Sequence, residues 1–287
     1  MIRFSKYIWV YFLLSALIIV PGLITLFRFG LRPAVDFTGG TLFEIKFASV
    51  VPQSTVEEML EKQQLTASSI QSSNGNDYII RLKPEENDKL QKFEESLKSE
   101  IVRNETVGPI LGKELLQKTF TAAIIAIIAI LSYVAYAFKN IKFGISAILA
   151  LLHDLVVVTG VFAILGHYYK VEVDTLFVTA FLTTMSFSVH DTIVVFDRIR
   201  ELVKRGERMP FEMICDKALT ETIGRSLSNS LTIIFMLLAL VLMGGTSIHW
   251  FVFALLVGTI SGTYSSDFVA TPILILWDRW ETRKKSV

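Results

Sequence analysis

The chain has 287 residues, of which 52% are hydrophobic and 19% are charged, and its mean hydropathy is +0.52. This composition excludes an ordinary soluble domain and predicts a membrane protein. The formal net charge of +1 says nothing about partners by itself, because the charged residues are divided between the two sides of the membrane. We expect membrane lipids around the chain and no nucleic-acid partner.

Six segments are long and apolar enough to cross a bilayer, which requires about 20 residues of helix. They cover 8–27, 119–138, 143–166, 175–196, 222–243 and 250–277. The first follows Arg3 and Lys6, as in a signal peptide, but it is too long for such a peptide and lacks a small-residue cleavage site. We interpret 1–28 as the N-terminus with a retained first membrane helix. Residues 119–277 contain the other five helices.

Basic residues are concentrated in the loops on one side of the predicted membrane helices. Segments 1–7, 139–142, 197–221 and 278–287 together hold fourteen Lys and Arg, whereas the short loops on the opposite side hold only Lys170. Because cytoplasmic loops are enriched in Lys and Arg, we predict that both termini are cytoplasmic in a multi-pass protein of the cytoplasmic (inner) membrane. Loop 197–221, with an interfacial helix at 211–222, and the basic tail 278–287 are then cytoplasmic, and 29–118 is extracytoplasmic.

The extracytoplasmic segment 29–118 is too polar for the membrane and is long enough for a domain. Its residues 41–47 alternate, with Phe43, Ile45 and Phe47 on one face, which predicts a half-buried strand. Ser54 and Glu57 have the spacing of a capping box, which predicts a helix from 54 to 64. No nucleophile–base set or metal-ligand cluster stands out, so we expect a binding or spacing module.

The second half of this domain completes a recognisable order of elements. Asn74-Gly75, between 67–73 and 77–83, predicts a hairpin. Segment 85–101 is amphipathic and predicts a helix, and a last strand is expected near Thr106. The order β-α-β-β-α-β predicts a ferredoxin-like α+β domain. The fold class is therefore an α-helical polytopic membrane protein with six transmembrane helices and an inserted α+β domain.

Two glycine-containing motifs flank the domain where the chain leaves and re-enters the membrane, at 35–41 and 107–115. Glycine and proline supply turn conformations that other residues resist. Because such motifs occur on both sides of the domain, we expect them to fix its orientation on its anchors. The candidate orienting residues are Asp36, Gly39, Gly40, Gly108, Pro109 and Gly112.

The fourth apolar segment contains Asp191, and an acid inside a membrane helix indicates a functional site. Helical spacing places Asp191 on one face with Ser188 and other hydroxyl residues, and it places Arg225 and Asn229 on one face of the fifth segment. Both charged residues lie an estimated ~5–8 Å from the cytoplasmic end of their helices. We therefore predict that Asp191 and Arg225 meet and couple to protons, with no cofactor besides the proton.

Further titratable residues lie within the predicted helices. His153-Asp154 is in the third segment, His190 precedes Asp191, and Asp267 is in the sixth segment. One Arg cannot neutralise three acids, which favours proton handling. We treat these residues as a candidate proton relay, although polar residues that only bind helices together remain an alternative. The candidate relay comprises His190, His153, Asp154, Asp267, Ser188 and Asn229.

Other chemistry has little support in the sequence. Adjacent residues point about 100° apart around a helix, so Ser188, His190 and Asp191 cannot align as a catalytic triad. We therefore expect neither an enzyme nor a metal site. Gly258 and Gly262 form a small-xxx-small pattern, which predicts close helix packing.

The motifs together resemble the SecF family, the smaller membrane subunits of SecDF protein-export complexes. The resemblance runs from the first helix to Leu276 and is specific through the order and spacing of its motifs, at 35–41, 107–115, 151–154, 188–201, 225–232 and 262–266. It implies a six-helix half of the resistance-nodulation-division type, with Asp191 and Arg225 as the functional intramembrane pair. Phe187, His190 and Asp267 depart from the residues usual in the family.

The resemblance also implies partners and a function. The partners would be a SecD-like subunit, a SecYEG-type translocon and exported preproteins. We expect the chain to use the proton-motive force to assist protein export. Two alternatives remain: a passive assembly subunit of a membrane complex, and a small-molecule or lipid exporter of the same superfamily, which would need a substrate-sized pocket in the outer domain.

Overall fold

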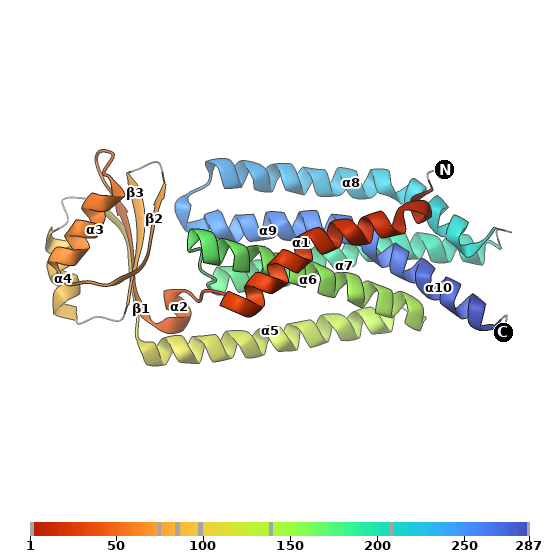
Figure 1. The fold of residues 1–287 in the computed structure, drawn as a ribbon, viewed down its shortest axis with the longest axis horizontal. Helices are drawn as coiled ribbons and strands as arrows, with labels where there is room; N and C mark the ends of the chain where they lie inside the picture. The colour runs from red at the N-terminus through yellow and green to blue at the C-terminus, as the bar shows by residue number, and fades with distance from the viewer. Residues whose placement is uncertain are drawn as a thin grey trace.

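A bundle of long helices carries a small sheet domain at one end, and both chain termini lie at the other end (Figure 1). This computed structural model describes residues 3–73, 76–83, 87–96, 100–137, 140–206 and 209–285. Six helical stretches are long and apolar enough to cross a membrane, so the predicted six spans are confirmed. Their helices are α1 (Ile8–Phe29), α5 (Pro109–Ala137), α6 (Ile141–Tyr169), α7 (Thr175–Lys204), α8 (Phe211–Met243) and α9 (Thr246–Ser265). α9 continues through a π-helical turn, η2 (Ser266–Ala270), into α10 (Thr271–Lys285), and a 3-10 turn, η1 (Phe4–Tyr7), precedes α1.

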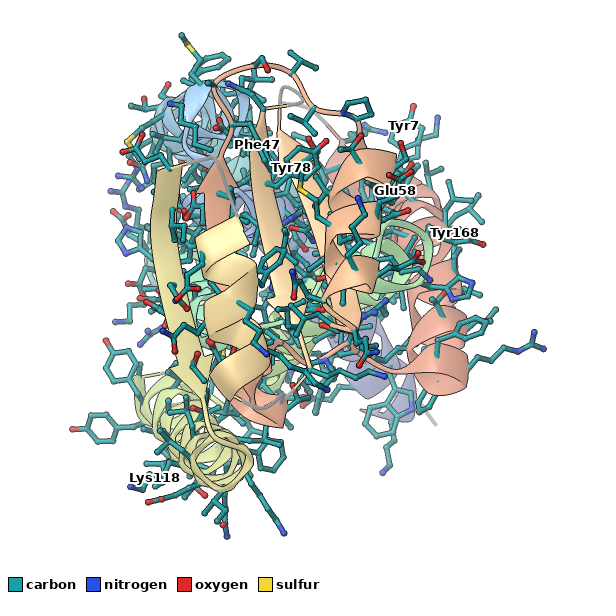
Figure 2. The ribbon with its side chains drawn as sticks, turned by 90° about the vertical axis from the view of Figure 1, so that its left-hand side faces the viewer. Tyr7, Phe47, Glu58, Tyr78, Lys118 and Tyr168 are labelled. Atoms are coloured by element: carbon teal, nitrogen blue, oxygen red, sulfur yellow. The ribbon has the colours of Figure 1, made fainter. Side chains whose placement is uncertain are left out.

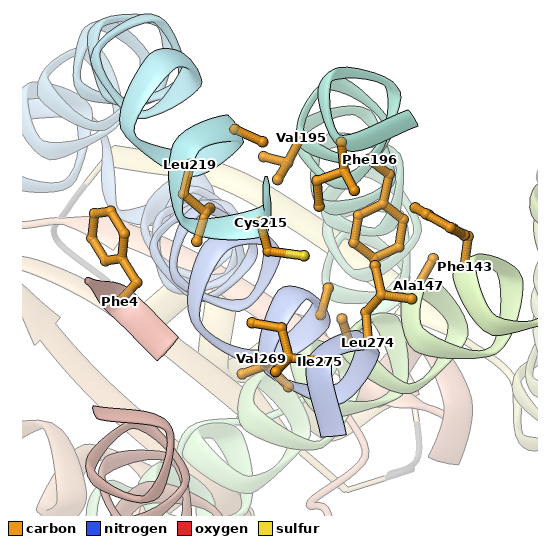
Figure 3. Close-up of a cluster of buried hydrophobic side chains, with 14 of the residues drawn as sticks. Phe4, Phe143, Ala147, Val195, Phe196, Cys215, Leu219, Val269, Leu274 and Ile275 are labelled. Carbon is orange, nitrogen blue, oxygen red and sulfur yellow. The ribbon is translucent and has the colours of Figure 1, made fainter. Parts of the chain in front are cut away.

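Several helices are longer than their apolar segments. α5 begins at Pro109 and α7 continues to Lys204. The predicted interfacial helix at 211–222 is not separate, because α8 is continuous from Phe211 to Met243. The predicted helix is therefore present but continuous with the membrane helix, because the first turns of α8 bury Cys215 and Leu219 in the same apolar cluster as Phe196 of α7 (Figure 3). Packing against α7 and α10 thus continues the helix beyond the apolar segment.

The sheet domain has the predicted ferredoxin-like order. Its elements are β1 (Gly40–Lys46), α3 (Gln53–Lys62), β2 (Ala67–Ser73), β3 (Asp77–Leu82), α4 (Asn87–Ser96) and β4 (Glu100–Val107). The strands pair in the order β2-β3-β1-β4, and each pairing is antiparallel. Helices α3 and α4 cover the sheet face that is turned away from the bundle (Figure 2). The opposite face is turned towards the membrane helices.

The alternation in β1 explains why the domain folds in this way. Phe43 and Ile45 are fully buried and Phe47 is nearly so. They pack with residues of α3, α4 and β3, such as Val56 and Phe93, in the core of the domain. The predicted capping box was wrong. α3 begins at Gln53 after Pro52 without a side-chain cap, because Gln53 donates to Glu57 instead.

The second predicted helix ends earlier than expected. α4 ends at Ser96, whereas Ile101 pairs with Ile45 in the sheet. Backbone hydrogen bonds to β1 stabilise the residues around Ile101 as a strand, although their amphipathic pattern is that of a helix. The hairpin strands β2 and β3 are confirmed by their register. Asn74-Gly75 and Leu97 lie outside the described residues.

Close backbone contact joins α1 to α6. A Cβ atom added at Gly22 would lie 2.8 Å from Cα of Gly160, which no real Cβ contact allows. The two helices therefore approach each other where each has a glycine. This contact holds the first helix against the rest of the bundle.

Candidate functional site

Asp191 lies inside the bundle, on the buried face of α7. It is 7% exposed, and its Oδ2 accepts a hydrogen bond from Ser230 of α8 at 3.3 Å. A small cavity of about 20 Å³ adjoins it, enough for one water molecule. His190 and Asn229 also line this cavity.

Arg225 does not meet Asp191, so the predicted pair is absent within the described residues. α8 turns Ser226 and Ser230 inward, whereas Arg225 and Asn229 are on its exposed face. Arg225 lines an open cavity with charged residues such as Glu221. Helical spacing correctly grouped the polar residues of α8 on one face, and this exposed face borders two cavities shared with α7, one lined by Arg225 and the other by Asn229. A polar face on the outside of a membrane helix is expected to be covered by another protein.

Asp154 is the most extensively hydrogen-bonded acid among the described residues of the bundle, at 4% exposure. Its carboxylate accepts hydrogen bonds of 2.6 Å each from Ser188, Ser261 and Ser265. The ring of His153 adds a fourth contact, at 3.0 Å between Nδ1 and Oδ1. This cluster joins α6, α7 and α9.

A chain of polar contacts extends this cluster to α1. Nε2 of His153 lies 3.0 Å from Oγ of Ser15. Ser15 lies 3.4 Å from the hydroxyl of Tyr264, which donates to the carbonyl oxygen of Tyr11 at 2.7 Å. Four helices of the bundle are therefore connected through one buried acid.

Asp267 lies in the π-helical turn between α9 and α10. It is 2% exposed, and its Oδ1 is buried without a hydrogen-bond partner in the described residues. The preceding Ser266 contacts Thr192, the residue after Asp191, at 3.0 Å between hydroxyl oxygens. The π turn therefore brings Asp267 to the part of α7 that carries Asp191, and π turns occur frequently at functional sites.

The candidate packing glycines lie against α7. A Cβ atom at Gly258 would be 2.2 Å from Cγ2 of Thr184, and one at Gly262 would be 3.1 Å from Cα of Ser188. These glycines let α9 approach the polar face of α7. The approach also brings Ser261 and Ser265 within reach of Asp154.

The two flanking motifs meet where the sheet domain joins the bundle. Gly39 has φ +77° and Gly40 φ +138°, conformations that favour glycine. A Cβ at Gly112 would be 2.8 Å from the backbone nitrogen of Gly39, whereas one at Gly108 would have open space. Pro109 is the first residue of α5. Close contact between α2 (Val35–Thr38) and α5 therefore requires Gly112.

Asp36 links the first motif to the helix that carries Asp191. Its Oδ2 accepts hydrogen bonds from the backbone nitrogen of Thr175, at 3.4 Å, and from its hydroxyl, at 3.1 Å. Thr175 is the first residue of α7, and Asp174 caps the same helix by accepting from Phe177 at 2.7 Å. Ala34 also donates to the carbonyl of Val173. The segment that leads into the sheet domain is thus attached to the start of α7.

A buried ion pair connects the sheet to the same region. Arg81 of β3 lies 3.1 Å from Glu172, and both are less than a tenth exposed. Burial raises the pKa of Glu172 even though Arg81 opposes the shift. Burial also raises the pKa of Asp174, against the hydrogen bond from Phe177. The junction therefore holds acids that bind protons more readily than exposed ones.

Sequence reasoning found the acids, and it named Ser188 and His153 among the candidate relay residues, but it missed the other partners of these acids. Ser15 and Ser230 lie in apolar stretches where a single serine carries no distinctive pattern. The i, i+4 spacing of Ser261 and Ser265 beside Gly258 and Gly262 was a usable signal. Among the described residues, no group of three or more His, Cys, Asp or Glu is arranged to hold a metal ion.

Comparison with known proteins places these features in a family. A model described as "Protein export membrane protein SecD/SecF, C-terminal" matches residues 86–280, and a "SecD/SecF GG Motif" model matches residues 24–49. The protein translocase subunit SecF of Thermobaculum terrenum is 42% identical, over 97% of this chain and 94% of that protein. The SecF subunit of Anaerolinea thermophila is 35% identical, over 96% of this chain and 94% of its own length.

Solved structures show the same likeness. The crystal structure of SecDF, a translocon-associated membrane protein from Thermus thermophilus, matches with a TM-score of 0.87 and 29% identity. The match covers 97% of this chain but 39% of the SecDF chain. A structure of SecDF in a super-membrane-facing form matches with a TM-score of 0.68 at the same identity. The chain is therefore similar to one part of a longer, fused SecDF protein.

Proposed function

The chain belongs to the SecD/SecF family of protein-export membrane proteins and is a SecF-like translocase subunit, and on this premise we propose that it uses the proton-motive force to assist the export of preproteins. The proton is the coupling ion, and no other cofactor is required. The observation that carries this proposal is the buried carboxylate of Asp191, for which Ser230 supplies the hydrogen bond. An ionisable group inside a membrane bundle is characteristic of proton pathways.

A SecD-like subunit is the first partner. In the fused relative from Thermus thermophilus one chain is named SecDF, and this chain aligns with 35% of it. The exposed polar face of α8, with Arg225, Ser228 and Asn229, is the surface we assign to this partner. Charged residues in membrane helices face other protein rather than lipid, which supports the assignment. A SecYEG-type translocon and the preprotein are the further partners.

The charges and the fold together support the orientation that we propose. Both termini lie at the end opposite the sheet domain (Figure 1), and that end carries the basic loops. The excess of Lys and Arg in cytoplasmic loops supports cytoplasmic termini in the inner membrane. The sheet domain is then extracytoplasmic, on the side where preproteins emerge.

The mechanism connects Asp191 to the sheet domain through α7. Proton binding neutralises Asp191 and changes how α7 packs against α8 at Ser230. Because Asp36 is bonded to Thr175 at the other end of α7, a shift of this helix moves the segment that leads into the sheet domain. The membrane potential supplies ~2.3 kcal/mol per charge per 100 mV, which biases two packing states tens-fold.

Asp191→Asn tests this function in vesicles that contain the complex with its SecD-like partner and a translocon. Export of a preprotein is measured with and without a proton gradient. We expect the gradient-dependent part of export to be lost, while Asp197→Asn, an exposed acid on the same helix, retains it. Unchanged gradient dependence in an intact Asp191→Asn complex would instead favour a passive assembly subunit.

The exporter alternative has less support. The SecF relatives from Thermobaculum terrenum and Anaerolinea thermophila are protein translocase subunits. The cavity beneath the sheet is lined by charged residues such as Glu44, Arg81 and Glu172, which does not suit an apolar substrate. We therefore retain protein export as the function of the chain.

A further inference from the structure

The row of hydrogen bonds that runs from α1 through Ser15 to His153 of α6 determines which of the bonded atoms carry a hydrogen. A hydroxyl group has one hydrogen to donate. Tyr264 uses its hydrogen on the carbonyl of Tyr11, because a carbonyl oxygen only accepts. The contact between Ser15 and Tyr264 therefore requires Ser15 to be the donor.

The direction of the next bond follows from this. Since Ser15 has already donated its hydrogen, its oxygen accepts from Nε2 of His153. On the other side of the ring, Nδ1 contacts Oδ1 of Asp154. An ionised carboxylate only accepts, so Nδ1 also carries a hydrogen. Both ring nitrogens are then donors, which is the imidazolium form of histidine.

The surroundings of Asp154 fit this assignment. Both oxygens of Asp154 act as acceptors, because three serine hydroxyls donate to them at 2.6 Å. This is the hydrogen-bonding pattern of an ionised carboxylate, and a buried carboxylate requires a countercharge. In the described residues, neither a Lys nor an Arg forms an ion pair with Asp154, whereas His153 lies beside it.

We propose that His153 is a proton-binding residue, separate from Asp191, whose proton neutralises Asp154 and decides whether Ser15 of α1 donates to Tyr264 of α9. Loss of this proton has a defined consequence. Nδ1 keeps its hydrogen for Asp154, so Nε2 becomes an acceptor. Ser15 then turns its hydrogen from Tyr264 to His153, so the hydrogen bond from Ser15 to Tyr264 is lost while that from Tyr264 to Tyr11 remains.

The position of Ser15 on α1 allows the protonation state of His153 to affect other parts of the molecule. Two turns further along α1, Gly22 is held against Gly160 by direct backbone contact. The α1–α6 interface thus has one fixed contact, between the glycines, and one hydrogen bond, between Ser15 and His153, whose direction depends on a proton. α1 leads directly to residues 32–36, which are bonded to the start of α7 and lead into the sheet domain.

Few other titratable groups among the described residues face this site. From α1 it meets Tyr11 and Ser15, from α7 Ser188, and from α9 Tyr264 with two serines. The next acids are Asp191, three residues after Ser188 on α7, and Asp267 in η2, a part of the chain that contacts α6. The charged contact of α6 with α10 involves Lys142 and Glu281, and Lys142 lies three turns from His153.

The inference deepens the proposed function and rests on it only for the role in export. Nitrogen NMR of ¹⁵N-histidine-labelled full-length chain in nanodiscs tests the proton directly. The chain has 4 histidines, and a variant with His167, His190 and His249 each changed to Gln leaves only the ring signals of His153. His153→Gln in the natural background assigns the same signals if the triple variant does not fold.

At pH 7.5 an unperturbed imidazole is about nine-tenths neutral. We expect His153 to show the imidazolium signal at this pH in the natural chain and to lose it in Asp154→Asn. A neutral His153 at pH 7.5 overturns the proposal, and so does an imidazolium that persists in Asp154→Asn. Neither result depends on Asp191, so failure here is distinguishable from failure of the proposed function.

The contact with α9 is tested in the same samples with ¹³C-labelled tyrosine. The Tyr264 signal, assigned by Tyr264→Phe, should shift with the titration of His153. In Ser15→Ala this shift should disappear while the imidazolium remains. The coupling to α1 is overturned if the Tyr264 signal does not shift with the titration of His153. It is also overturned if the shift is equally large in Ser15→Ala.

Discussion

At the scale of single residues, Asp154 of α6 and Asp191 of α7 differ in what surrounds them. Asp154 receives three serine hydroxyls and an imidazole, whereas Asp191 receives one hydroxyl at the longer distance of 3.3 Å. A carboxylate with many donors loses several bonds when it is protonated, and one with a single donor loses little. Asp191 is therefore the residue suited to bind and release protons, and Asp154 is suited to hold a fixed arrangement.

The donors of Asp154 should contribute measurably to stability. We expect Ser261→Ala to lower the free energy of unfolding by about 0.6–2 kcal/mol, the range found for polar contacts between membrane helices. Unfolding of the reconstituted chain measures this difference. Ser228→Ala, on the exposed face of α8, is the control and should change stability by less than about 0.5 kcal/mol. Equal effects of the two variants would contradict the role given to the cluster.

At the scale of helices and strands, local pattern predicted most of the fold. The alternation of Phe43, Ile45 and Phe47 and the six apolar segments correspond to real elements. Errors arose where packing continued a helix, as at Cys215 in α8, or where strand pairing ended one, as at Ile101. The site was predicted less completely, because periodicity groups Arg225 with Asn229 on a face but does not say which neighbour that face meets. Contacts such as that of Asp154 with Ser261, which are 107 positions apart, arise only from the tertiary fold.

The contact of α1 with α6 depends on its glycines. We expect Gly22→Ala to destabilise the chain by about 1–3 kcal/mol, because the added methyl group collides with the backbone of Gly160. Gly224→Ala is a matched control in α8, where the new Cβ meets nothing within 4 Å. Thermal unfolding of both variants measures the difference, and a Gly22→Ala chain as stable as Gly224→Ala would show that the helices do not need this approach.

The junction of the sheet and the bundle should respond to pH. Burial raises the pKa of Glu172 from its ordinary 4.5, so the folded chain binds this proton more tightly than the unfolded chain. Its contribution to stability is then fully present below pH 4.5 and is lost as the pH rises through the raised value.

Glu172→Gln removes this titration and isolates its effect. We expect the stability of the natural chain to fall more steeply with rising pH than that of the variant, as measured by unfolding across this range. Subtracting the variant's curve of stability against pH from that of the natural chain cancels the contributions of all other acids. A variant curve parallel to the natural one would mean that Glu172 does not titrate in the junction.

At the scale of the whole molecule, the fold forms one connected path from the membrane core to the outer domain. Asp191 lies on α7, α7 begins at Thr175, and Thr175 is bonded to Asp36 just before β1. Gly112 holds α5 against the same motif. The sheet domain is thus attached to the bundle at both of its chain connections, as the two flanking motifs led us to expect.

The exposed face of α8 should be needed for assembly. We expect Arg225→Ala to reduce the amount of SecD-like subunit that co-purifies with the chain, because a polar face inside the membrane loses its charged contact. Arg205→Ala, an exposed Arg at the end of α7, serves as the control. Undiminished co-purification of Arg225→Ala would assign this face to another role.

The central claim is that protons binding at Asp191 move the sheet domain through Asp36. Proton uptake and preprotein export, recorded together in vesicles that contain the complete complex, test it most directly. We predict that Asp191→Asn stops proton uptake and gradient-driven export, whereas Asp36→Ala leaves proton uptake intact and abolishes gradient-driven export. Gradient-driven export that persists in Asp36→Ala, or proton uptake that persists in Asp191→Asn, would contradict this coupling.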